Sequence, residues 1–227
     1  HWVYQKHMYD LTLIIPAKNE RESLPKVIAE LNNKYKIKVV LKENDYETIE
    51  VIKNLNVEII MQTGNGYGNA LIEGIKNCKT EYWCIINADG SMDPKYIKEM
   101  LEKCYDKDFV FGTRYKKPGG GSDDDTLVTF IGNKFFSFIG NIMFNLNLTD
   151  ILYTYVMGKK KSFEKLKITS SDFRFCVELP IKAKKANLKF IDLPSYERAR
   201  IGGKKKVNAI KDGFLILLEM FTLFLKK

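Results

Sequence analysis

Short apolar runs alternate with amphipathic segments through the first half of the chain. The segments between the runs place apolar residues at helical spacing, as residues 22–33 do with Leu24, Val27, Ile28 and Leu31. Strands that alternate with helices in this way predict an α/β fold with a mostly parallel sheet, which binds ligands at the carboxyl ends of its strands. The expected strands are 11–15, 37–41, 57–61, 81–87 and 108–112, and the expected helices are 22–33, 45–54, 67–77 and a segment beginning at Pro94.

The pattern changes after residue 112. Residues 114–126 contain three consecutive glycines and three consecutive aspartates, which predicts a loop. We expect its part 117–125 to be disordered without ligand and to order over the donor or the acceptor. The elements expected further along are one or two helices in 127–145, a helix at 177–187 despite Pro180, a strand at 188–194 and a final helix at 208–227.

The expected domain organisation has three parts. Residues 1–10 are interpreted as an N-terminal extension or the remnant of an expression tag, because HWVYQKH shows no pattern. Residues 11–207 form the α/β domain. Residues 208–227 form a separate C-terminal amphipathic helix with a narrow polar stripe. No stretch reaches the roughly 18 uninterrupted apolar residues typical of a membrane-spanning helix, and the longest approach is 213–225.

Composition indicates a globular protein with an anionic partner. Apolar residues make up 45% and charged residues 29% of the 227 residues, which excludes a disordered or fibrous chain. The 37 Lys and Arg exceed the 28 Asp and Glu by 9, which favours nucleic acid, acidic lipid or phosphorylated small molecules as partners. Four Cys without close pairing and two His make a zinc site or a disulfide framework improbable.

Two segments carry candidate nucleotide chemistry. NADGSMDP (87–94) follows an expected buried strand, so that Asp89 could hold a divalent cation whose other ligands are phosphate oxygens and water. An Asp that caps a turn is an equally good interpretation. TGNGYGNALIEG (63–74) is a glycine-rich turn into a helix, which lets a backbone approach a nucleotide but also suits a tight turn before a packed helix.

Basic residues near the end of the chain are candidate phosphate ligands. YERARIGGKKK (196–206) places Arg198, Arg200 and Lys204 to Lys206 around a glycine pair. Arg114, after the fifth expected strand, is a further candidate. The alternatives are a solvated basic loop for the first group and a surface ion pair for Arg114.

These segments together resemble family 2 glycosyltransferases, in particular dolichyl- or polyprenyl-phosphate sugar synthases. LTLIIPAKNERESLP is similar to the opening strand and turn of that family, and GYGNALIEGI with NADGSMDP to its glycine helix and DxD region. The later matches are GTRY, the GN at 132–133, LTDILYTY (148–155) and the segment from Phe173 to Gly213. The resemblance covers about residues 11 to 213.

The resemblance implies a GT-A (Rossmann-like) fold and an inverting transfer that uses a metal-bound nucleotide diphosphate as leaving group. The implied catalytic residues are Asp89, Asp150 and Arg114, with Asp150 as the base if the acceptor is a hydroxyl. The implied ligands of Mg²⁺ or Mn²⁺ are Asp89, Asn87 and Ser91.

The resemblance also implies two sets of binding residues. The nucleotide-binding set is Pro16, Ala17, Glu20, Glu43, Asp45 and Gly68. The acceptor- or phosphate-binding set is Arg198, Arg200, Lys206 and Glu178.

The chain departs from the family pattern at several sites. Asn87 stands in place of the first Asp of DxD, and the usual DDGS after the second strand is replaced by Leu41 to Asn44, for which Glu43 or Asp45 would substitute. An Arg usual before the GN is absent at Thr129 and Phe130, and the usual G-[FY]-R is Thr154 to Val156.

The expected function is transfer of one sugar from a nucleotide-sugar to a polyprenyl phosphate or a glycan. The alternatives are transfer to a sugar hydroxyl and a catalytically weakened relative that binds nucleotide-sugar or lipid phosphate. Nucleic acid is not expected, because the sequence lacks a recognisable nucleic-acid-binding motif. We expect a cytoplasmic protein that is peripheral on the cytoplasmic face of an anionic membrane, with the final helix at the bilayer. The alternatives for this helix are packing on the domain and pairing with another subunit in a homo-oligomer.

Overall fold

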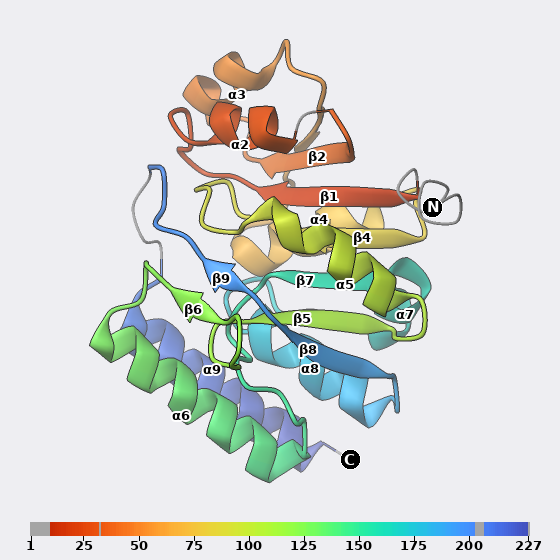
Figure 1. Ribbon diagram of the computed structural model, residues 1–227, viewed down its shortest axis with the longest axis vertical. Coiled ribbons are helices and arrows are strands. Elements are labelled where there is room, and N and C mark those ends of the chain that lie inside the picture. Colours follow the sequence, from red (N-terminus) through yellow and green to blue (C-terminus); the bar gives the residue numbers. More distant parts are fainter. Residues whose placement is uncertain (1–9, 32, 203–206, 227) are drawn as a thin grey trace.

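The computed structural model describes residues 10–31, 33–202 and 207–226. The expected N-terminal extension and Lys204 to Lys206 therefore lie almost wholly outside the described residues. Within the described part, one sheet has seven strands in the order β3-β2-β1-β4-β7-β5-β8 (Figure 1). Its strands are β1 (Leu11–Pro16), β2 (Lys36–Leu41), β3 (Glu58–Met61), β4 (Tyr82–Ile85), β5 (Phe109–Thr113), β7 (Val156–Lys159) and β8 (Phe190–Pro194).

The expected mostly parallel sheet is confirmed, with one antiparallel strand that the sequence did not reveal. Strand β7 runs antiparallel between β4 and β5, with Gly158 opposite both Trp83 and Phe109. A Cβ at Gly158 would lie 2.5 Å from the Phe109 ring and 2.6 Å from the Trp83 ring. Glycine therefore allows two aromatic rings from the neighbouring strands to meet over β7.

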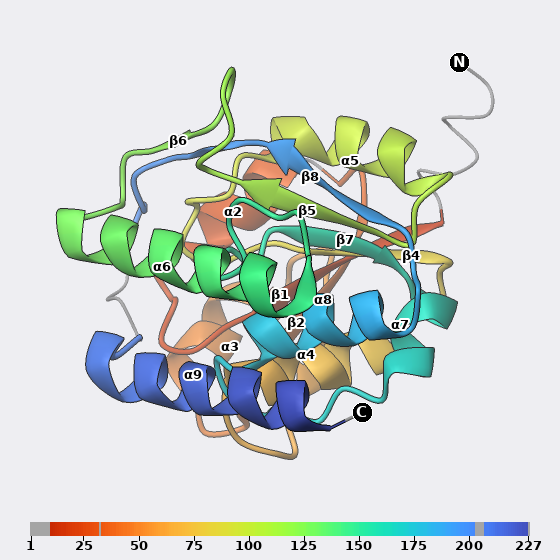
Figure 2. The same cartoon turned by 90° about the horizontal axis from the view of Figure 1, so that it is seen from below.

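Helices cover both faces of the sheet and create two cores (Figures 1 and 2). One core joins the sheet to α2 (Leu24–Leu31), α3 (Tyr46–Ile52) and α5 (Ile97–Cys104), which follows the short helix η1 (Pro94–Tyr96). The other core joins it to α4 (Tyr67–Lys76), α7 (Lys160–Leu166) and α8 (Phe175–Lys185). Alternate residues of each strand enter opposite cores, as Ile14 and Ile15 do in β1.

The last helix, α9 (Ala209–Leu225), packs beside α6 (Leu127–Phe144), and both run in the same direction (Figures 1 and 2). The rings of Phe144 and Phe224 lie 5.9 Å apart, and Phe136 contacts Gly213. The segment 127–145 is thus a single helix, which begins at a capping box formed by Thr126 and Thr129. By length and hydropathy α6 could cross a membrane, although polar residues interrupt its apolar run, and 11% of it is buried.

The glycine- and aspartate-rich loop has a defined path in the structure. Its strand β6 (Gly121–Ser122) pairs in parallel with β9 (Tyr196–Glu197), and the backbone N–H of Asp123 donates to Glu197 at 2.9 Å. All three aspartates accept hydrogen bonds from side chains, those of Tyr196, Arg200 and Tyr115. The expected ordering of 117–125 on ligand binding stays a prediction.

The glycines at the start of α4 serve packing, and the expected nucleotide-binding role of Gly68 stays a prediction. A Cβ at Gly68 would lie 2.3 Å from the carbonyl oxygen of Ser170 and 2.6 Å from that of Asp172. At Gly66, where φ is +95°, a Cβ would lie 2.3 Å from the Ser171 carbonyl oxygen. The glycines therefore allow the segment before α8 to cross the start of α4 at backbone contact distance.

We expect Gly68→Ala to lower the free energy of unfolding by about 1–3 kcal/mol, because backbone atoms rather than flexible side chains oppose the new methyl group. Gly132→Ala is the matched control. It also lies in a helix, but its new methyl group meets nothing within 4 Å, so we expect about 0.5–1 kcal/mol of stabilisation. Urea denaturation of the two variants measures both values, and equal effects would contradict the packing role of Gly68.

Candidate active site

The carboxyl ends of the parallel strands lie on the left in Figure 1, opposite the N-terminus. Pro16 ends β1, and the backbone N–H of Ala17 donates to the Val40 carbonyl at 2.9 Å, which ties the turn to β2. Glu20 and Asp45 are buried in this turn. The Glu20 carboxylate accepts from the Ser23 hydroxyl at 2.6 Å, and the Asp45 carboxylate accepts from the Asn19 N–H at 2.7 Å.

Glu20 and Asp45 therefore shape the turn, and their expected contact with the nucleotide stays a prediction. Asn19 has φ of 54°, and its N–H contact with Asp45 stabilises this left-handed conformation. Glu43, in contrast, is exposed and lines a cleft at this edge.

The cleft at the ends of β1, β2 and β3 is the candidate nucleoside site. Tyr46 stands at its rim with 73% of its surface exposed. Glu73 holds the segment after β3 that forms one side of the cleft. Its carboxylate accepts hydrogen bonds from the N–H and hydroxyl of Thr63 and from the N–H of Gly64. The cleft is lined by Lys18, Lys42, Glu43, Asn44, Tyr46, Met61, Gln62, Thr63 and Asn65.

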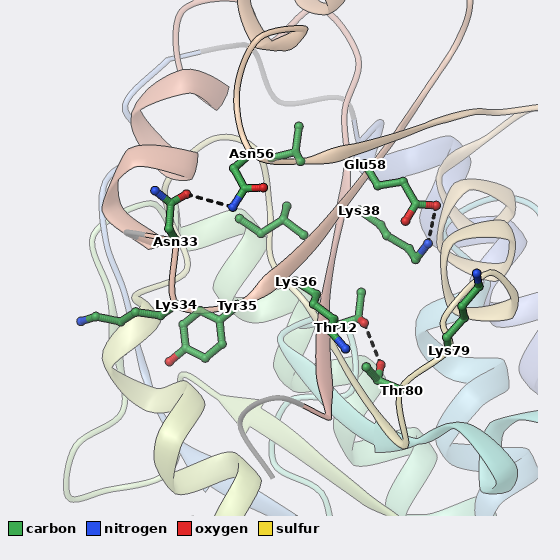
Figure 3. A pocket seen from close by; sticks show the side chains of 12 residues that line it. Thr12, Asn33, Lys34, Tyr35, Lys36, Lys38, Asn56, Glu58, Lys79 and Thr80 are labelled. Carbon is green, nitrogen blue, oxygen red and sulfur yellow. Dashed lines mark hydrogen bonds and ion pairs between the residues drawn. The ribbon is translucent and has the colours of Figure 1, made fainter. Parts of the chain in front are cut away.

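A second pocket opens at the opposite edge of the sheet, around the amino ends of β1, β2 and β3 (Figure 3). Lys38 pairs with Glu58 at 2.5 Å, and the Thr12 and Thr80 hydroxyls are 2.7 Å apart. None of the predicted site residues lines this pocket. Because parallel sheets bind ligands at the carboxyl edge, we assign the active site to the other end.

Asp89 lies after β4 with one carboxylate oxygen available to a cation. Its Oδ1 accepts from the Ser91 N–H at 3.0 Å, and its Oδ2 lies 3.6 Å from the Arg200 guanidinium. Asn87 Oδ1 accepts from the Tyr67 hydroxyl at 3.1 Å, and Ser91 is 1% exposed.

These residues fit a cation that a diphosphate carries in, but not a metal cage made by protein alone. The described residues contain no group of three or more His, Cys, Asp or Glu that could hold a metal ion. Mg²⁺ bound with phosphates needs only one or two protein carboxylates, which Asp89 supplies. The Asn87 amide oxygen retains a free lone pair, whereas the burial of Ser91 argues against its expected place as a ligand.

The two arginines of the basic segment have different roles. Arg198 forms a bidentate ion pair with Glu30 at 2.6 and 2.9 Å and donates to the Gly90 carbonyl at 2.9 Å. It therefore fixes the Asp89 loop to α2, and its expected contact with the acceptor stays a prediction. Arg200 lies between Asp89 and Asp124, and its NH2 group donates to the Asp124 carboxylate at 2.8 Å. It therefore lies where a diphosphate would meet the cation.

Arg114 is the centre of a buried ionic cluster. Its guanidinium pairs with Asp150 in bidentate geometry at 2.7 and 3.0 Å, and with Glu197 at 3.2 Å. Asp125 lies 3.5 Å away. We name Arg114, Asp125, Asp150 and Glu197 the arginine cluster. The donors of Arg114 are thereby engaged by carboxylates, and its expected contact with a phosphate stays a prediction.

Asp150 is a positioning residue in this arrangement rather than an open general base. Its side chain has no exposed surface, and both of its oxygens accept from Arg114. Burial raises the pKa of Glu197, and this effect outweighs the opposite effects of Arg114 and the Ser122 hydroxyl.

Glu178 has structural partners, and its expected contact with the acceptor stays a prediction. It is 1% exposed and accepts hydrogen bonds from Lys182 at 2.6 Å and from the Ser170 N–H at 2.7 Å. Burial raises its pKa, but these hydrogen bonds prevail and hold the pKa below the ordinary value. Lys206, the remaining expected phosphate ligand, lies outside the described residues.

The sequence analysis did not single out Glu197 or Tyr67. It also did not predict that each of the three loop aspartates has its own side-chain partner. Glu197 stands beside Arg198 in a strongly basic segment. A single acidic residue in such a segment is ordinarily interpreted as a surface residue that offsets the neighbouring positive charges. Its position becomes informative only when β9 is known to run beside Met92 and the Asp89 loop.

We expect Asp150→Asn to lower the free energy of unfolding by about 3–5 kcal/mol, because it leaves the Arg114 charge buried without its main partner. The exposed Glu50–Lys53 pair is the control, and Glu50→Ala should cost less than about 1 kcal/mol. Chemical denaturation gives both numbers. Lost turnover with unchanged stability in Asp150→Asn would instead support the general-base role.

The fold is shared with solved sugar transferases. A glucosyl-3-phosphoglycerate synthase from Mycobacterium tuberculosis, solved with Mn²⁺, UDP and glucosyl-3-phosphoglycerate, superimposes with a TM-score of 0.75 at 10% identity, over 96% of this chain and 81% of that chain. A mannosyl-3-phosphoglycerate synthase from Rubrobacter xylanophilus gives 0.71 at 14% identity, over 96% and 76% of the two chains. At these identities the likeness shows the fold, which is the expected GT-A architecture.

Sequence comparison identifies the family. Uncharacterized glycosyltransferases from Mycobacterium tuberculosis and Mycobacterium bovis are 27% identical to this chain over 215 residues, which cover 93% of it and 95% of each relative. Residues 12–167 match the model for glycosyl transferase family 2. The chain therefore belongs to glycosyl transferase family 2 and is a glycosyltransferase.

Proposed function

We propose that the protein transfers a sugar from a nucleotide diphosphate sugar to a phosphorylated lipid, such as a polyprenyl phosphate, at a membrane surface. The donor half of this proposal is supported by the cleft beside β2 and by Asp89 at the end of β4. It is also supported by the similar synthase that was solved with UDP and Mn²⁺ or Mg²⁺. The lipid half is carried by one observation, the apolar surface of α6 and α9.

Asp89 and Arg200 are the groups for the donor diphosphate. A bound divalent cation would supply positive charge to the departing diphosphate. Asp89, with Asn87 beside it, would hold this cation. Arg200 is then released from Asp89 and remains within reach of the phosphates, where its planar guanidinium can form two hydrogen bonds.

The state of Asp150 agrees with a phosphate acceptor. A phosphate oxygen is already ionised near neutral pH and attacks the anomeric carbon without a general base. A hydroxyl acceptor would need one, and both oxygens of Asp150 are held by Arg114.

An apolar surface, which we name the α6–α9 face, extends from the acceptor side of the site. Both helices repeat large apolar side chains every three to four residues on their outer surface, and each of these is at least 50% exposed. The face consists of Leu127, Ile131, Phe135, Phe138 and Ile142 on α6, and Ile210, Phe214, Leu218, Phe221 and Leu225 on α9. Contiguous apolar surface of this kind marks a membrane or protein contact.

Charge favours a bilayer as the occupant of this face. Lys134 and Lys211 are exposed on the two helices, whereas Asp212 and Glu219 interact with Asn208 and Arg174. The exposed charge is therefore basic and complements anionic headgroups. Helix α6 begins directly after Asp125 of the arginine cluster, so a lipid lying along the face would present its headgroup to the site.

A water-soluble phosphorylated acceptor is the second candidate. The similar solved synthases carry phosphoglycerate in their names and complexes. Such an acceptor would share the phosphate chemistry and would leave the α6–α9 face without a role in catalysis. Turnover measured with polyprenyl phosphate and with 3-phosphoglycerate as acceptors distinguishes the two candidates.

We expect Asp89→Ala to lower turnover by about a hundredfold or more, because it removes the carboxylate that holds the cation against the leaving group. The assay follows release of UDP or GDP from UDP-glucose or GDP-mannose with Mn²⁺ and polyprenyl phosphate. Asp106→Ala, an exposed carboxylate paired with Lys107, is the control and should retain full turnover. Undiminished turnover in folded Asp89→Ala would remove Asp89 from the mechanism.

We expect the protein to co-sediment with anionic vesicles. The double variant Phe138→Glu, Phe221→Glu should no longer co-sediment, because it places two negative charges at the centre of the α6–α9 face. Raised salt should weaken binding by screening the lysines. Val51→Glu, also an exposed apolar position, is the control and should bind as the unmodified chain does. Absence of vesicle binding, with dimers in solution that the double variant dissociates, would identify the face as a subunit interface and refute the membrane proposal.

A further inference from the structure

One buried tyrosine hydroxyl beside the site has no partner. Among the residues that the structure describes, Tyr153 Oη forms no hydrogen bond, although the residue is only 5% exposed. Buried hydroxyls are ordinarily paired, so an unpaired one requires a reason. The hydroxyl is available to a ligand that the protein alone does not contain.

The position of Tyr153 links it to both halves of the site. Its ring lies against Arg114, whose Cζ is 4.6 Å from the ring centre. Burial raises the pKa of its hydroxyl well above the ordinary value. The charges of Glu197, Asp150 and Asp89 raise it further, and Arg114 opposes them. The hydroxyl thus keeps its proton and lies within the electrostatic influence of both Asp89 and the arginine cluster.

The charges around the hydroxyl select the kind of ligand. The arginine against the Tyr153 ring is already neutralised by Asp150 and Glu197, so this place offers an anionic group no free positive charge. A neutral sugar needs no such charge, and a tyrosine hydroxyl both donates and accepts hydrogen bonds, as sugar hydroxyls do. The place is also appropriate, because the transferred sugar must lie between the diphosphate at Asp89 and the acceptor side.

Tyr155 provides an internal comparison. It is equally buried, and its ring meets that of Tyr153 edge to face at 6.2 Å. Its hydroxyl, however, donates to the Asp93 carbonyl at 2.8 Å. Of two neighbouring tyrosines, one therefore has a structural hydrogen bond and the other has none.

We propose that Tyr153 is a sugar-binding residue, whose hydroxyl exchanges hydrogen bonds with a hydroxyl of the transferred sugar. This inference rests on the proposed donor, a nucleotide diphosphate sugar. Because the hydroxyl is enclosed in the present arrangement, the sugar enters only when the side chains around Tyr153 move apart.

Binding measurements on Tyr153→Phe test the inference, because this change removes the hydroxyl and keeps the ring against Arg114. Calorimetric titrations with Mn²⁺ compare UDP with UDP-glucose and GDP with GDP-mannose. We expect the Kd of the bound nucleotide-sugar to rise about tenfold, the loss of one hydrogen bond of about 1.4 kcal/mol. The Kd of the matching free nucleotide should not change. The melting temperature should stay the same or rise, because an unpaired buried hydroxyl is removed.

Tyr155→Phe is the matched control. It should lower the melting temperature, because the Asp93 carbonyl loses its donor, and it should leave both Kd values unchanged. Equal Kd values of unmodified protein and Tyr153→Phe for the nucleotide-sugar would overturn the inference. The inference would also be overturned if Tyr153→Phe bound nucleotide and nucleotide-sugar more weakly by the same factor, or if its melting temperature fell. Either result would show that the hydroxyl stabilises the fold instead of contacting the sugar.

A failure of the proposed function looks different. If the unmodified protein binds none of the four compounds with Mn²⁺, the proposed donor is wrong, and the sugar-binding role of Tyr153 falls with it. If it binds nucleotide-sugar and Tyr153→Phe binds equally well, only the role of Tyr153 is refuted.

Discussion

The buried pairing of Arg114 with three carboxylates connects most of the candidate active site. Arg114 follows β5, Asp125 ends the loop before α6, Asp150 lies after α6, and Glu197 belongs to β9. Taking these charges out of water costs several kcal/mol per ion, which the close contacts must offset. The rings of Tyr115 and Tyr153, with centroids 5.1 and 4.6 Å from the guanidinium carbon, add attraction to its charge. The arginine cluster is therefore stable only when all four segments are in place.

Strand β9 transmits this arrangement to the donor side. After Glu197, the chain runs beside the Asp89 loop, where the N–H groups of Arg198 and Ile201 donate to the carbonyls of Ser91 and Asp89 at 2.8 and 2.7 Å. The same strand pairs with β6 on its other side. A shift of the loop 114–126 is thus coupled through β9 to the carboxylate that would hold the cation. Strand β9 therefore joins the arginine cluster to the Asp89 loop.

The fold was predictable where local pattern and tertiary packing agree. The five apolar runs became β1 to β5, and all but the edge strand β3, which is partly exposed, are buried within the sheet. Strand β7 was missed because its four residues, Val156 to Lys159, carry no alternation, and their pairing with β4 and β5 depends on contacts distant in sequence. Asp89 was selected because its motif follows a buried strand, and Arg200 because arginines around a glycine pair suit phosphate oxygens; the structure brings the two within 3.6 Å of each other, and their roles stay predictions.

Other site residues have structural partners that a residue type does not reveal. Gly68, Glu20 and Asp45 stand in motifs that suit nucleotide binding, yet Gly68 and Asp45 meet nearby backbone and the Glu20 carboxylate accepts from the Ser23 hydroxyl. Arg114 and Asp150 were both selected, but for contact with substrate, since nothing in the spacing of residues 114 and 150 shows that they pair. Glu197 was passed over because only the path of β9 brings it to Arg114.

Helix α6 links the two unusual features of this molecule, the buried charge and the exposed apolar surface. Its first turn is fixed by Thr126 and by Asp125, whose carboxylate accepts from Thr129 at 3.0 Å, so its start cannot move independently of the arginine cluster. Its outer side nevertheless exposes Leu127 and Phe138 at 74% and 64%. An apolar surface of this length is unfavourable in water, and so the fold retains it only at a cost in stability and solubility. The proposed acceptor, a phosphorylated lipid that lies in the apolar phase, would give this surface a role and would reach the site along the helix.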